Sequence, residues 1–554
     1  MEDQVKQEIP SESIAPHQLQ APPTTSTSVR LTDQTNLLPV RKIVAAFLGL
    51  ALCIVVSTLD SVIVATAIPT ISASFDAGAV VSLVPASYLL TSTSFQPLYG
   101  RFSDIFGRKT ALCTAMTIFM IGNLLAGFSR SIVQLIVFRG IAGSGGGGII
   151  SMVQIVISDI VSLRERGKYQ GILGGVIAIG YAIGPIIGGA LAQKVTWRWC
   201  FWISIPTSVC AMSVVVFLLP LKPVVGSMRS KLLVVDYVGA ILTLGGCALV
   251  IFPLIWGGVT FPWKSAVVLA PLCSGFVVVV LFCLWEWKGA RLPIIPMHIF
   301  KHSTVCGVYI TMFVNGFVYF SSLYYLPQFF QVVLGYDPIR AGIFLIPVLV
   351  SQMVATWIAG IIVSHTGRYR IIIYLGFSIW SIACGLISTV TPQSHKSVLV
   401  IYMLLAGIGT GNTLQTTTVA AQASVERQDM SVVTAFRNFI QMLGGTLALA
   451  IGSTFINNSL RSSMVDLSLP SDMISRVIDS LTKLSFPEQL GLSNTLAMDI
   501  LNAGYAKGFK SVFLLNASLT AMATVVSVLM IKHKELSRPA DEKLKEEAQK
   551  QSQG

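Results

Sequence analysis

The stretch Gly100–Lys109, GRFSDIFGRK, lies between two long apolar runs and carries three cations and one acid. A charged side chain in the centre of a bilayer costs about 2.5–3.5 kcal/mol even on the insertion scale. We therefore expect this stretch to be a short loop at a membrane face. Gly100 and Gly107 permit a tight reversal of the chain at little steric cost. The stretch therefore predicts that the chain crosses a membrane both before Gly100 and after Lys109.

The composition of the whole chain also indicates a membrane protein. Of its 554 residues, 53% are hydrophobic and only 11% are charged, whereas soluble domains have about a quarter charged residues. The net charge of +13 would suit nucleic acid, but the cations lie in short segments between apolar runs, as membrane orientation requires. We therefore expect no nucleic-acid binding. The nine cysteines lie in apolar runs without metal-ligand spacing, so we expect neither a disulfide framework nor a metal site.

Fourteen apolar runs are long enough to cross about 30 Å of hydrocarbon as helices. The segments on the same side as Gly100–Lys109 hold most of the Lys and Arg residues between runs, which places them and both ends of the chain in the cytoplasm. We predict an all-α membrane protein with fourteen transmembrane helices. The runs are 43–67, 78–99, 110–128, 132–157, 170–192, 199–219, 237–256, 266–285, 304–330, 341–364, 371–390, 398–423, 433–455 and 512–531.

The charged stretch has a second copy later in the chain. Gly360–Arg368 repeats the glycine spacing of Gly100–Arg108. Two like-oriented halves of six helices, with two helices inserted between them, fit this repeat. The second copy has Ser364 where the first has Asp104, so the two halves differ chemically.

These patterns divide the chain into segments. Residues 1–40 are rich in Pro, Ser, Thr and Gln without apolar periodicity, which is typical of disorder. A long outer segment after the thirteenth run contains Asn457-Asn458-Ser459, which predicts glycosylation at Asn457. The predicted segments are a disordered cytoplasmic tail (1–42), an N-terminal six-helix half (43–219), a linker with two inserted helices (220–303), a C-terminal six-helix half (304–531) with an outer loop at 457–510, and a cytoplasmic tail (532–554).

Two charged residues, Asp60 and Arg139, lie well inside apolar runs, and Arg437 lies at the start of the thirteenth run. Ionisable groups within a membrane are functional candidates because their burial is costly. A carboxyl group can load and release a proton as its surroundings change between wet and dry, whereas an arginine keeps its charge. We therefore expect Asp60 to carry a proton and Arg139 to bias it through its field. In the structural alternative, Asp60 bonds to the hydroxyl groups of Ser57 or Ser61 and Arg139 is a hydrogen-bond hub.

The fifth run contains the string GYAIGPIIGG, with Gly180, Gly184, Pro185, Gly188 and Gly189. Glycines four residues apart line one face of a helix and let a neighbouring backbone approach. Pro185 frees a carbonyl group and can kink the helix. The string resembles the G-x-x-x-G-P-x-x-G-G motif of antiporter branches of the major facilitator superfamily. This resemblance implies export rather than import.

Further stretches resemble the fourteen-helix drug:proton antiporter family of that superfamily. They are Leu59–Pro69 (LDSVIVATAIP), the glycine string of the fifth run and Trp197–Pro206 (WRWCFWISIP), while Arg164–Gln170 (RERGKYQ) looks like fungal members. Gly100–Lys109 resembles the signature loop between the second and third helices of the superfamily. The resemblance implies the major facilitator fold and a proton-coupling or cation-binding role for Asp60. It also implies a gating loop that locks the two halves together on the cytoplasmic face. The residues of that gating loop are Gly100, Asp104, Gly107, Arg108 and Lys109.

We predict a proton-coupled efflux pump that exports small amphipathic organic molecules, such as drugs or secondary metabolites, across the plasma membrane. Its partners are the substrate, protons and the lipid bilayer, and we expect a monomer. We find no nucleophile–base pair, metal cluster or nucleotide motif in the sequence, so we expect no enzyme activity and no cofactor. Polar residues within the runs are candidates for the substrate cavity, with helix–helix hydrogen bonding as the alternative. They are Gln96, Gln154, Asn315, Gln328, Asn412, Gln415 and Asn438.

Two other functions stay open at this point. A vacuolar, proton-coupled transporter of basic amino acids would share the fold, and the string DQTNLL at 33–38, which resembles an acidic dileucine sorting signal, favours it. A nutrient sensor or receptor that keeps the fold without transporting is the second. Long cytoplasmic signalling tails would favour the sensor, whereas the predicted tails of this chain are short.

Overall fold

The computed structural model describes residues 34, 37–77, 80–81, 83–221, 224, 227–257, 261–391, 393–479 and 493–536. All of them belong to one compact unit, Leu31–Gly554. Thirteen helical segments in this part of the chain are long and apolar enough to cross a membrane, and they coincide with thirteen of the fourteen predicted runs. The prediction of an all-α membrane fold is confirmed.

The remaining predicted run is α2 (Leu83–Phe106), a helix of 24 residues. At 1.5 Å per residue, this helix is long enough for about 30 Å of hydrocarbon. It carries buried Ser, Thr, Gln, Arg and Asp side chains, which lower its hydropathy. These polar groups are covered by neighbouring helices instead of lipid, so α2 is an interior helix of the bundle.

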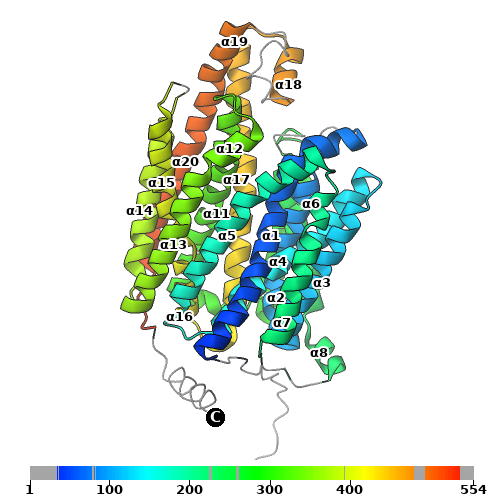
Figure 1. Cartoon of the computed structure of the whole chain (residues 1–554), viewed down its shortest axis with the longest axis vertical. Coiled ribbons are helices and arrows are strands. Elements are labelled where there is room, and N and C mark those ends of the chain that lie inside the picture. Colours follow the sequence, from blue (N-terminus) through cyan, green and yellow to red (C-terminus); the bar gives the residue numbers. More distant parts are fainter. Residues whose placement is uncertain are drawn as a thin grey trace, which may run out of the picture. The chain divides into compact units, whose positions relative to one another are not determined.

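The first group of helices, here the N-terminal group, is built around α1, α2 and α4 (Figure 1). In this group α4 packs against both α2 and α3, while α1 packs against α5 and α7. Besides α2, its helices are α1 (Val40–Phe75), α3 (Arg108–Gly127), α4 (Ile132–Ile160), α5 (Arg166–Lys194), α6 (Trp199–Trp202) and α7 (Ser204–Leu218).

A second set of helices, here the C-terminal group, packs in the same manner and meets the first mainly through two helix pairs. Within it α11 packs against α17, α13 against α15, and α14 against α15 and α20. The two groups meet where α2 contacts α17 and where α5 contacts α13. The helices are α11 (Ser303–Val332), α12 (Pro338–Phe344), α13 (Ile346–Thr366), α14 (Arg370–Ile387), α15 (Lys396–Leu414), α16 (Thr416–Ser424), α17 (Met430–Asp466) and α20 (Ala506–Met530).

Between the groups the chain forms α8 (Met228–Val234), α9 (Tyr237–Trp256), α10 (Ala266–Lys288) and the short helix η2 (Met297–Lys301). Helix α9 packs against α10 and also against α2 and α17. The most apolar stretch of α10 is only 11% buried inside the protein. An apolar helix with so little protein cover is stable where lipid surrounds it.

A run of glycines lets α4 pack closely against its neighbours. A Cβ atom on Gly147 would lie 2.0 Å from the carbonyl oxygen of Ser92 on α2, and one on Gly145 would lie 2.4 Å from that of Ala115 on α3. Neither contact leaves room for a methyl group. The glycines of α4 therefore serve helix packing, which is the common use of small residues in membrane helices.

Gly100–Lys109 is not a loop, so that prediction is wrong. Helix α2 continues to Phe106 and α3 begins at Arg108, so that only Gly107 interrupts the two helices. Gly107 has φ 100°, a conformation that glycine adopts without steric cost. Arg101, Asp104 and Arg108 of this stretch are buried in a network of ion pairs that also includes Asp159 of α4.

The predicted boundaries at the tail and the outer loop also need correction. In the expected disordered tail, Gln34 and Leu37 are buried, and the backbone N–H of Leu38 donates to the carbonyl oxygen of Ile160. In the expected outer loop, α17 runs on to Asp466 and is followed by α18 (Ser471–Asp479), α19 (Asn494–Asp499) and the π-helix η6 (Ile500–Tyr505). Residues 480–492 of this loop lie outside the described residues. Asn457 lies within α17, and its glycosylation stays a prediction.

Candidate functional site

Asp60 on α1 and Arg139 on α4 form a buried ion pair. Nη1 of Arg139 lies 2.8 Å from Oδ2 of Asp60, and the two side chains are 1% and 0% exposed. The hydroxyl groups of Ser57 and Ser61 donate to the carbonyl oxygens of Gly146 and Thr58, so they are engaged elsewhere. The partner of Asp60 is therefore Arg139, the other charged residue that lies well inside an apolar run.

Polar and aromatic side chains enclose this ion pair. Oδ1 of Asn123 on α3 accepts a hydrogen bond of 3.0 Å from Arg139, and the ring of Tyr88 on α2 lies 4.3 Å from the guanidinium carbon. In the described part of the chain, Oδ1 of Asp60 and Nε of Arg139 have no hydrogen-bond partner. Breaking a buried ion pair by neutralising one member costs about 3–5 kcal/mol. A proton arriving on Asp60 would therefore favour a different arrangement around Arg139.

The sequence suggested that Asp60 was the one buried acid, but the structure shows others. Asp159 near the end of α4 is 3% exposed, and Glu286 near the end of α10 is 4% exposed. Oε2 of Glu286 accepts a hydrogen bond of 3.1 Å from the backbone N–H of Ile295. Sequence reasoning missed both acids because the predicted runs stopped at residues 157 and 285, just before them.

The charged stretch forms a second network, here the charged lock, made of Arg101, Asp104, Arg108, Asp159 and Ser431. Oδ1 of Asp104 accepts a hydrogen bond of 2.5 Å from Nη1 of Arg108, and Oδ2 accepts one of 3.4 Å from Nη1 of Arg101. Nε of Arg108 also lies 2.7 Å from Oδ2 of Asp159. The hydroxyl group of Ser431 on α17 lies 2.8 Å from both carboxylate oxygens of Asp104. The charged lock thus joins α2, α3 and α4 of the N-terminal group to α17 of the C-terminal group.

Gln34 braces the charged lock from the segment before α1. Its Nε2 donates to the carbonyl oxygens of Ser103 at 3.1 Å and Asp104 at 3.3 Å. Its Oε1 accepts from the backbone N–H of Arg108 at 3.1 Å. One amide side chain therefore bridges the end of α2 and the start of α3, across Gly107.

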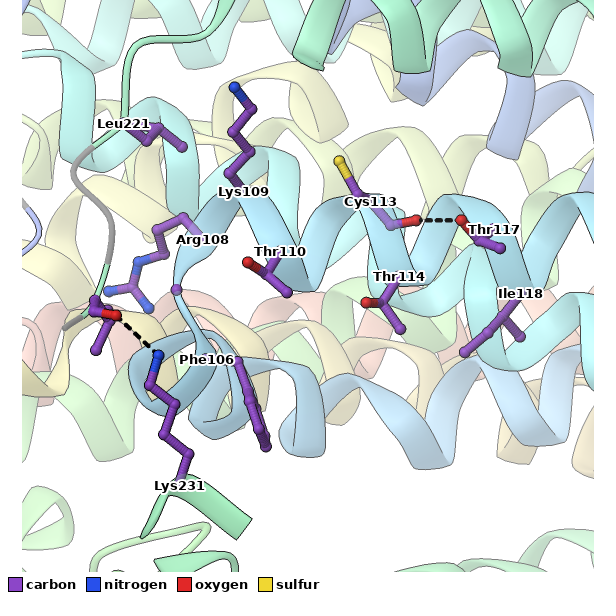
Figure 2. A pocket seen from close by; sticks show the side chains of 12 residues that line it. Phe106, Arg108, Lys109, Thr110, Cys113, Thr114, Thr117, Ile118, Leu221 and Lys231 are labelled. Atoms are coloured by element: carbon purple, nitrogen blue, oxygen red, sulfur yellow. Dashed lines mark hydrogen bonds between the residues drawn. The ribbon is translucent and has the colours of Figure 1, made fainter. Parts of the chain in front are cut away.

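Lys109 is not part of the charged lock. Its Nζ donates to the carbonyl oxygen of Val216 on α7 at 2.6 Å, and Figure 2 shows that the side chains of Arg108 and Lys109 leave α3 in different directions. Both residues line a cavity of about 590 Å³ beside the start of α3, with Lys231 of α8 across from them. Nζ of Lys231 donates to the carbonyl oxygen of Val224 at 2.8 Å. Lys109 therefore ties α3 to α7 within the N-terminal group, whereas the bond of Lys231 stays within the linker.

Two arginines of the stretch RERGKYQ add further contacts between the groups. Arg164 donates from Nε to the carbonyl oxygen of Ser364 at 3.2 Å and from Nη2 to that of His365 at 3.1 Å. Nη1 of Arg166 lies 3.3 Å from Oε1 of Gln422 on α16. Ser364 occupies the position of Asp104 in the second copy of the motif, and there its backbone carbonyl takes part in the contact.

The glycines of α5 lie against α1. A Cβ atom would lie 1.9 Å from Oγ1 of Thr58 if placed on Gly180, and 2.3 Å from the carbonyl oxygen of Ile63 if placed on Gly188. On Gly184 it would lie 2.4 Å from a methyl group of Val62. Pro185 lies inside the same helix. The face of α5 that carries these glycines is therefore in backbone contact with the helix that holds Asp60.

A small cavity of about 40 Å³, here the central cavity, lies between the two groups. Of the seven predicted cavity residues, Gln96, Gln154, Gln415 and Asn438 line it, whereas the other three do not. Sequence reasoning missed six polar or aromatic lining residues, because nothing in a single sequence states which face of a membrane helix points inward. The predicted residues away from the cavity are Asn315, Gln328 and Asn412, and the missed ones are Thr58, Tyr181, Tyr319, Phe320, Arg437 and Gln441.

One hydrogen bond at the wall of the central cavity joins the two groups, and two others brace the wall within the C-terminal group. Nδ2 of Asn438 on α17 donates to Oε1 of Gln154 on α4 at 3.0 Å. Nη1 of Arg437 donates to Oδ1 of Asn438 at 2.7 Å. Asn315, although outside the cavity, accepts from Nε2 of Gln441 at 3.0 Å. A volume of about 40 Å³ is far below the 300–1,000 Å³ of sites for drug-sized ligands, so a substrate enters only when the groups move apart.

Comparison with known proteins agrees with this architecture. The family model described as Major Facilitator Superfamily matches residues 50–449. Efflux pump dotC of Dothistroma septosporum is 39% identical over 77% of this chain and 73% of its own length. Citrate exporter 1 of Yarrowia lipolytica is 33% identical over 90% of this chain and 74% of its own.

A solved structure supports the fold independently of close sequence similarity. The proton:xylose symporter XylE aligns with a TM-score of 0.57 at 16% identity, over 91% of this chain and 99% of its own. The likeness at this identity concerns the fold alone, but the family model covers most of the chain. The chain therefore belongs to the major facilitator superfamily and is a multi-pass membrane transporter.

Proposed function

We propose that this transporter exports small amphipathic organic molecules in exchange for protons. The observation that carries the proposal is the buried pair of Asp60 and Arg139, with one carboxylate oxygen left without a partner among the described residues. Intramembrane ionisable groups are typical of proton relays. The efflux pump and the citrate exporter among the similar proteins support the outward direction of transport.

In this mechanism, the proton binds to Oδ1 of Asp60 and weakens the ion pair with Arg139. Arg139 cannot give up its own proton, so it then seeks other acceptors, of which Asn123 is already in contact. Helix α1, which carries Asp60, shares a close interface with α5, and α5 contacts α13 of the C-terminal group. A shift of α1 therefore reaches the boundary between the groups.

The charged lock determines which side of the central cavity is closed. It joins α2 to α17 on the face that the distribution of cations assigns to the cytoplasm. In the described conformation the lock is formed, so the cytoplasmic path to the cavity is closed. Substrate loading from the cytoplasm requires that Ser431 and Asp104 separate.

The geometry favours the plasma membrane over the vacuole. The vacuolar alternative depended on a dileucine-like string, in which Leu37 is only 7% exposed and the backbone of Leu38 bonds to Ile160. A sorting signal must be accessible to the protein that reads it. We therefore propose that Leu37 and Leu38 are part of the fold and that the transporter acts at the cell surface.

Proton exchange can be tested with the purified chain in proteoliposomes that contain a pH-sensitive dye. Adding a transported member of a metabolite panel should move protons in the direction opposite to substrate, and an imposed pH gradient should concentrate that substrate. Movement of substrate that ignores the pH gradient would overturn proton coupling. Accumulation driven in the same direction as the protons would overturn export.

A further inference from the structure

Arg437 differs from the buried residues Arg108 and Arg139 in its partners. It lies on α17, is 1% exposed, and lines the central cavity. Arg108 and Arg139 each face a carboxylate at hydrogen-bond distance. Among the residues that the structure describes, no carboxylate forms an ion pair with Arg437. A buried charge without a counter-ion is costly, so its retention in the cavity calls for an explanation.

The guanidinium group of Arg437 is held by neutral acceptors. Nη1 donates to Oδ1 of Asn438 at 2.7 Å. Nη2 donates to the carbonyl oxygen of Leu414 and lies 3.3 Å from Oγ1 of Thr417. These bonds fix the orientation of the group without cancelling its charge, and Nε has no partner in the described part of the chain.

Other polar atoms at the same cavity are also unused. Neither amide atom of Gln96, which is 0% exposed, has a hydrogen-bond partner among the described residues, and the same holds for Oε1 of Gln415. Buried polar groups are nearly always satisfied. Unsatisfied amide groups beside a fixed cation are those that a bound polar ligand would satisfy.

The remaining wall of the central cavity suits the organic part of such a ligand. The rings of Tyr181 on α5 and Tyr319 on α11 face each other with their centroids 6.2 Å apart, and Phe320 lies beside them. The residues that line the cavity include no Asp or Glu, so a cationic substrate would meet Arg437 without a balancing acid. Basic amino acids fit this cavity poorly for the same reason.

We infer that the transported molecule is an organic anion of the carboxylate type, whose anionic group pairs with Arg437 and hydrogen-bonds to Gln96. This inference rests on the proposed function and adds the class of substrate. Arginine suits the task because its charge is permanent and its planar donors match a carboxylate. The aromatic side chains of Tyr181, Tyr319 and Phe320 then contact the apolar part of the substrate.

The test uses the purified full chain and matched probes that differ only in charge. The probes are the carboxylate, amide and ammonium forms of one naphthyl, one phenylpropyl and one decyl compound. Binding is measured as a shift in melting temperature, and transport is measured in proteoliposomes under a pH gradient. We expect the best carboxylate to bind at least about tenfold more tightly than its amide, because only the carboxylate supplies the counter-ion that the buried Arg437 lacks. Binding of an ammonium form in preference to the carboxylate would overturn the inference.

Variants at the cavity separate recognition of charge from folding. Gln96→Glu adds an acid of nearly the same shape at a side chain that loses no hydrogen bond, and it should weaken carboxylate binding at least about tenfold by neutralising Arg437. Arg437→Lys should keep the preference for anions with weaker binding, whereas Arg437→Gln should lose the preference. Gln328→Glu, on α11 away from the cavity, is the control for added charge. An unchanged carboxylate preference in Gln96→Glu would contradict the inference.

The two proposals fail in different ways. If carboxylates bind but a pH gradient does not drive them, proton exchange is wrong and the anion site stands. If a pH gradient drives a neutral or cationic probe while carboxylates do not bind, proton exchange stands and the anion site is wrong.

Discussion

The hydroxyl group of Ser431 lies 2.8 Å from both carboxylate oxygens of Asp104, a residue 327 positions earlier in the chain. Asp104 is already paired with Arg101 and Arg108 of its own group. The hydroxyl group therefore adds one contact across the boundary to a carboxylate that its own arginines hold in place. A lock of this kind opens by losing one hydrogen bond and leaves no unpaired charge behind.

We expect Ser431→Ala to favour the conformation in which the central cavity opens to the cytoplasm. A hydrogen bond to a charged group contributes about 1.5–3 kcal/mol, so the balance between conformations should shift by a factor of about ten or more. The measurement is the rate at which a thiol reagent reaches a cysteine at Gln415 from the cytoplasmic side. Ser424→Ala is the control, because its buried hydroxyl donates only within α16. Equal rates in the two variants would refute a locking role for Ser431.

Asp104→Asn should have a larger effect than Ser431→Ala, because it also weakens the ion pair with Arg108. Asp159 still pairs with Arg108 in this variant, so membrane insertion and surface expression should be near normal. Transport should fall because the cytoplasmic side no longer closes reliably. Normal transport at matched surface expression would show that the charged lock does not gate transport.

Asp60→Asn should abolish accumulation driven by a pH gradient while substrate binding survives, since an amide cannot titrate. The variant leaves Arg139 without its carboxylate, so we expect a loss of stability below the about 3–5 kcal/mol of a fully broken buried pair. Melting temperature and transport are measured on the same preparations. The double variant Asp60→Asn, Arg139→Gln should regain stability but not coupling. If the double variant again concentrates substrate in response to pH, the pair is structural and the proton uses another path.

Gly188→Ala should disturb the contact of α5 with α1. The added methyl group would lie 2.3 Å from the backbone carbonyl oxygen of Ile63, and backbone atoms cannot turn aside as side chains do. A cost of about 1–3 kcal/mol is typical of overpacking. Gly385→Ala in α14 is the matched control, because open space surrounds that position. Melting temperatures that fall equally in both variants, or in neither, would contradict the proposed close contact.

The orientation can be tested with single cysteines on a background without native cysteines. Gln428 is exposed just before α17, and Thr495 is exposed near the start of α19. The excess of Lys and Arg on the side of Gly100–Lys109 predicts labelling of Gln428→Cys from the cytoplasm and of Thr495→Cys from outside. Labelling of both cysteines from the same side would invalidate the assignment of the two faces.

Hydropathy predicted the helical fold well, because thirteen of the fourteen runs reappear as long apolar helices. It failed at Gly100–Lys109, where charges signalled a loop. There Asp104 pairs with Arg101 and Arg108, and Asp159 of α4 supplies the second acid, a compensation that hydropathy cannot register. Helix α2 shows the same limit: its buried polar side chains lower its hydropathy, although the helix is long enough to span the membrane.

The candidate site was predicted in part. Asp60 and Arg139 stood out because charges are rare inside apolar runs, but their direct contact depends on how α1 and α4 pack. Arg437 was noticed only as a residue at the start of a run. Its importance comes from the absence of a nearby acid among the described residues, and such an absence is visible only in three dimensions. Gln328 and Asn412 looked equivalent to Gln96 in sequence, yet only Gln96 lines the central cavity.

Gln34 lies before the first membrane helix but supports the charged lock. Its amide group holds the backbone on both sides of Gly107, although the first membrane helix starts only at Val40. A shortened chain that starts at that helix would keep its membrane-spanning segments but lose this brace. Truncations and fusions for expression should therefore leave residues from Gln34 onward intact, since a cut chosen from hydropathy alone would alter the gate while the protein still inserted and folded.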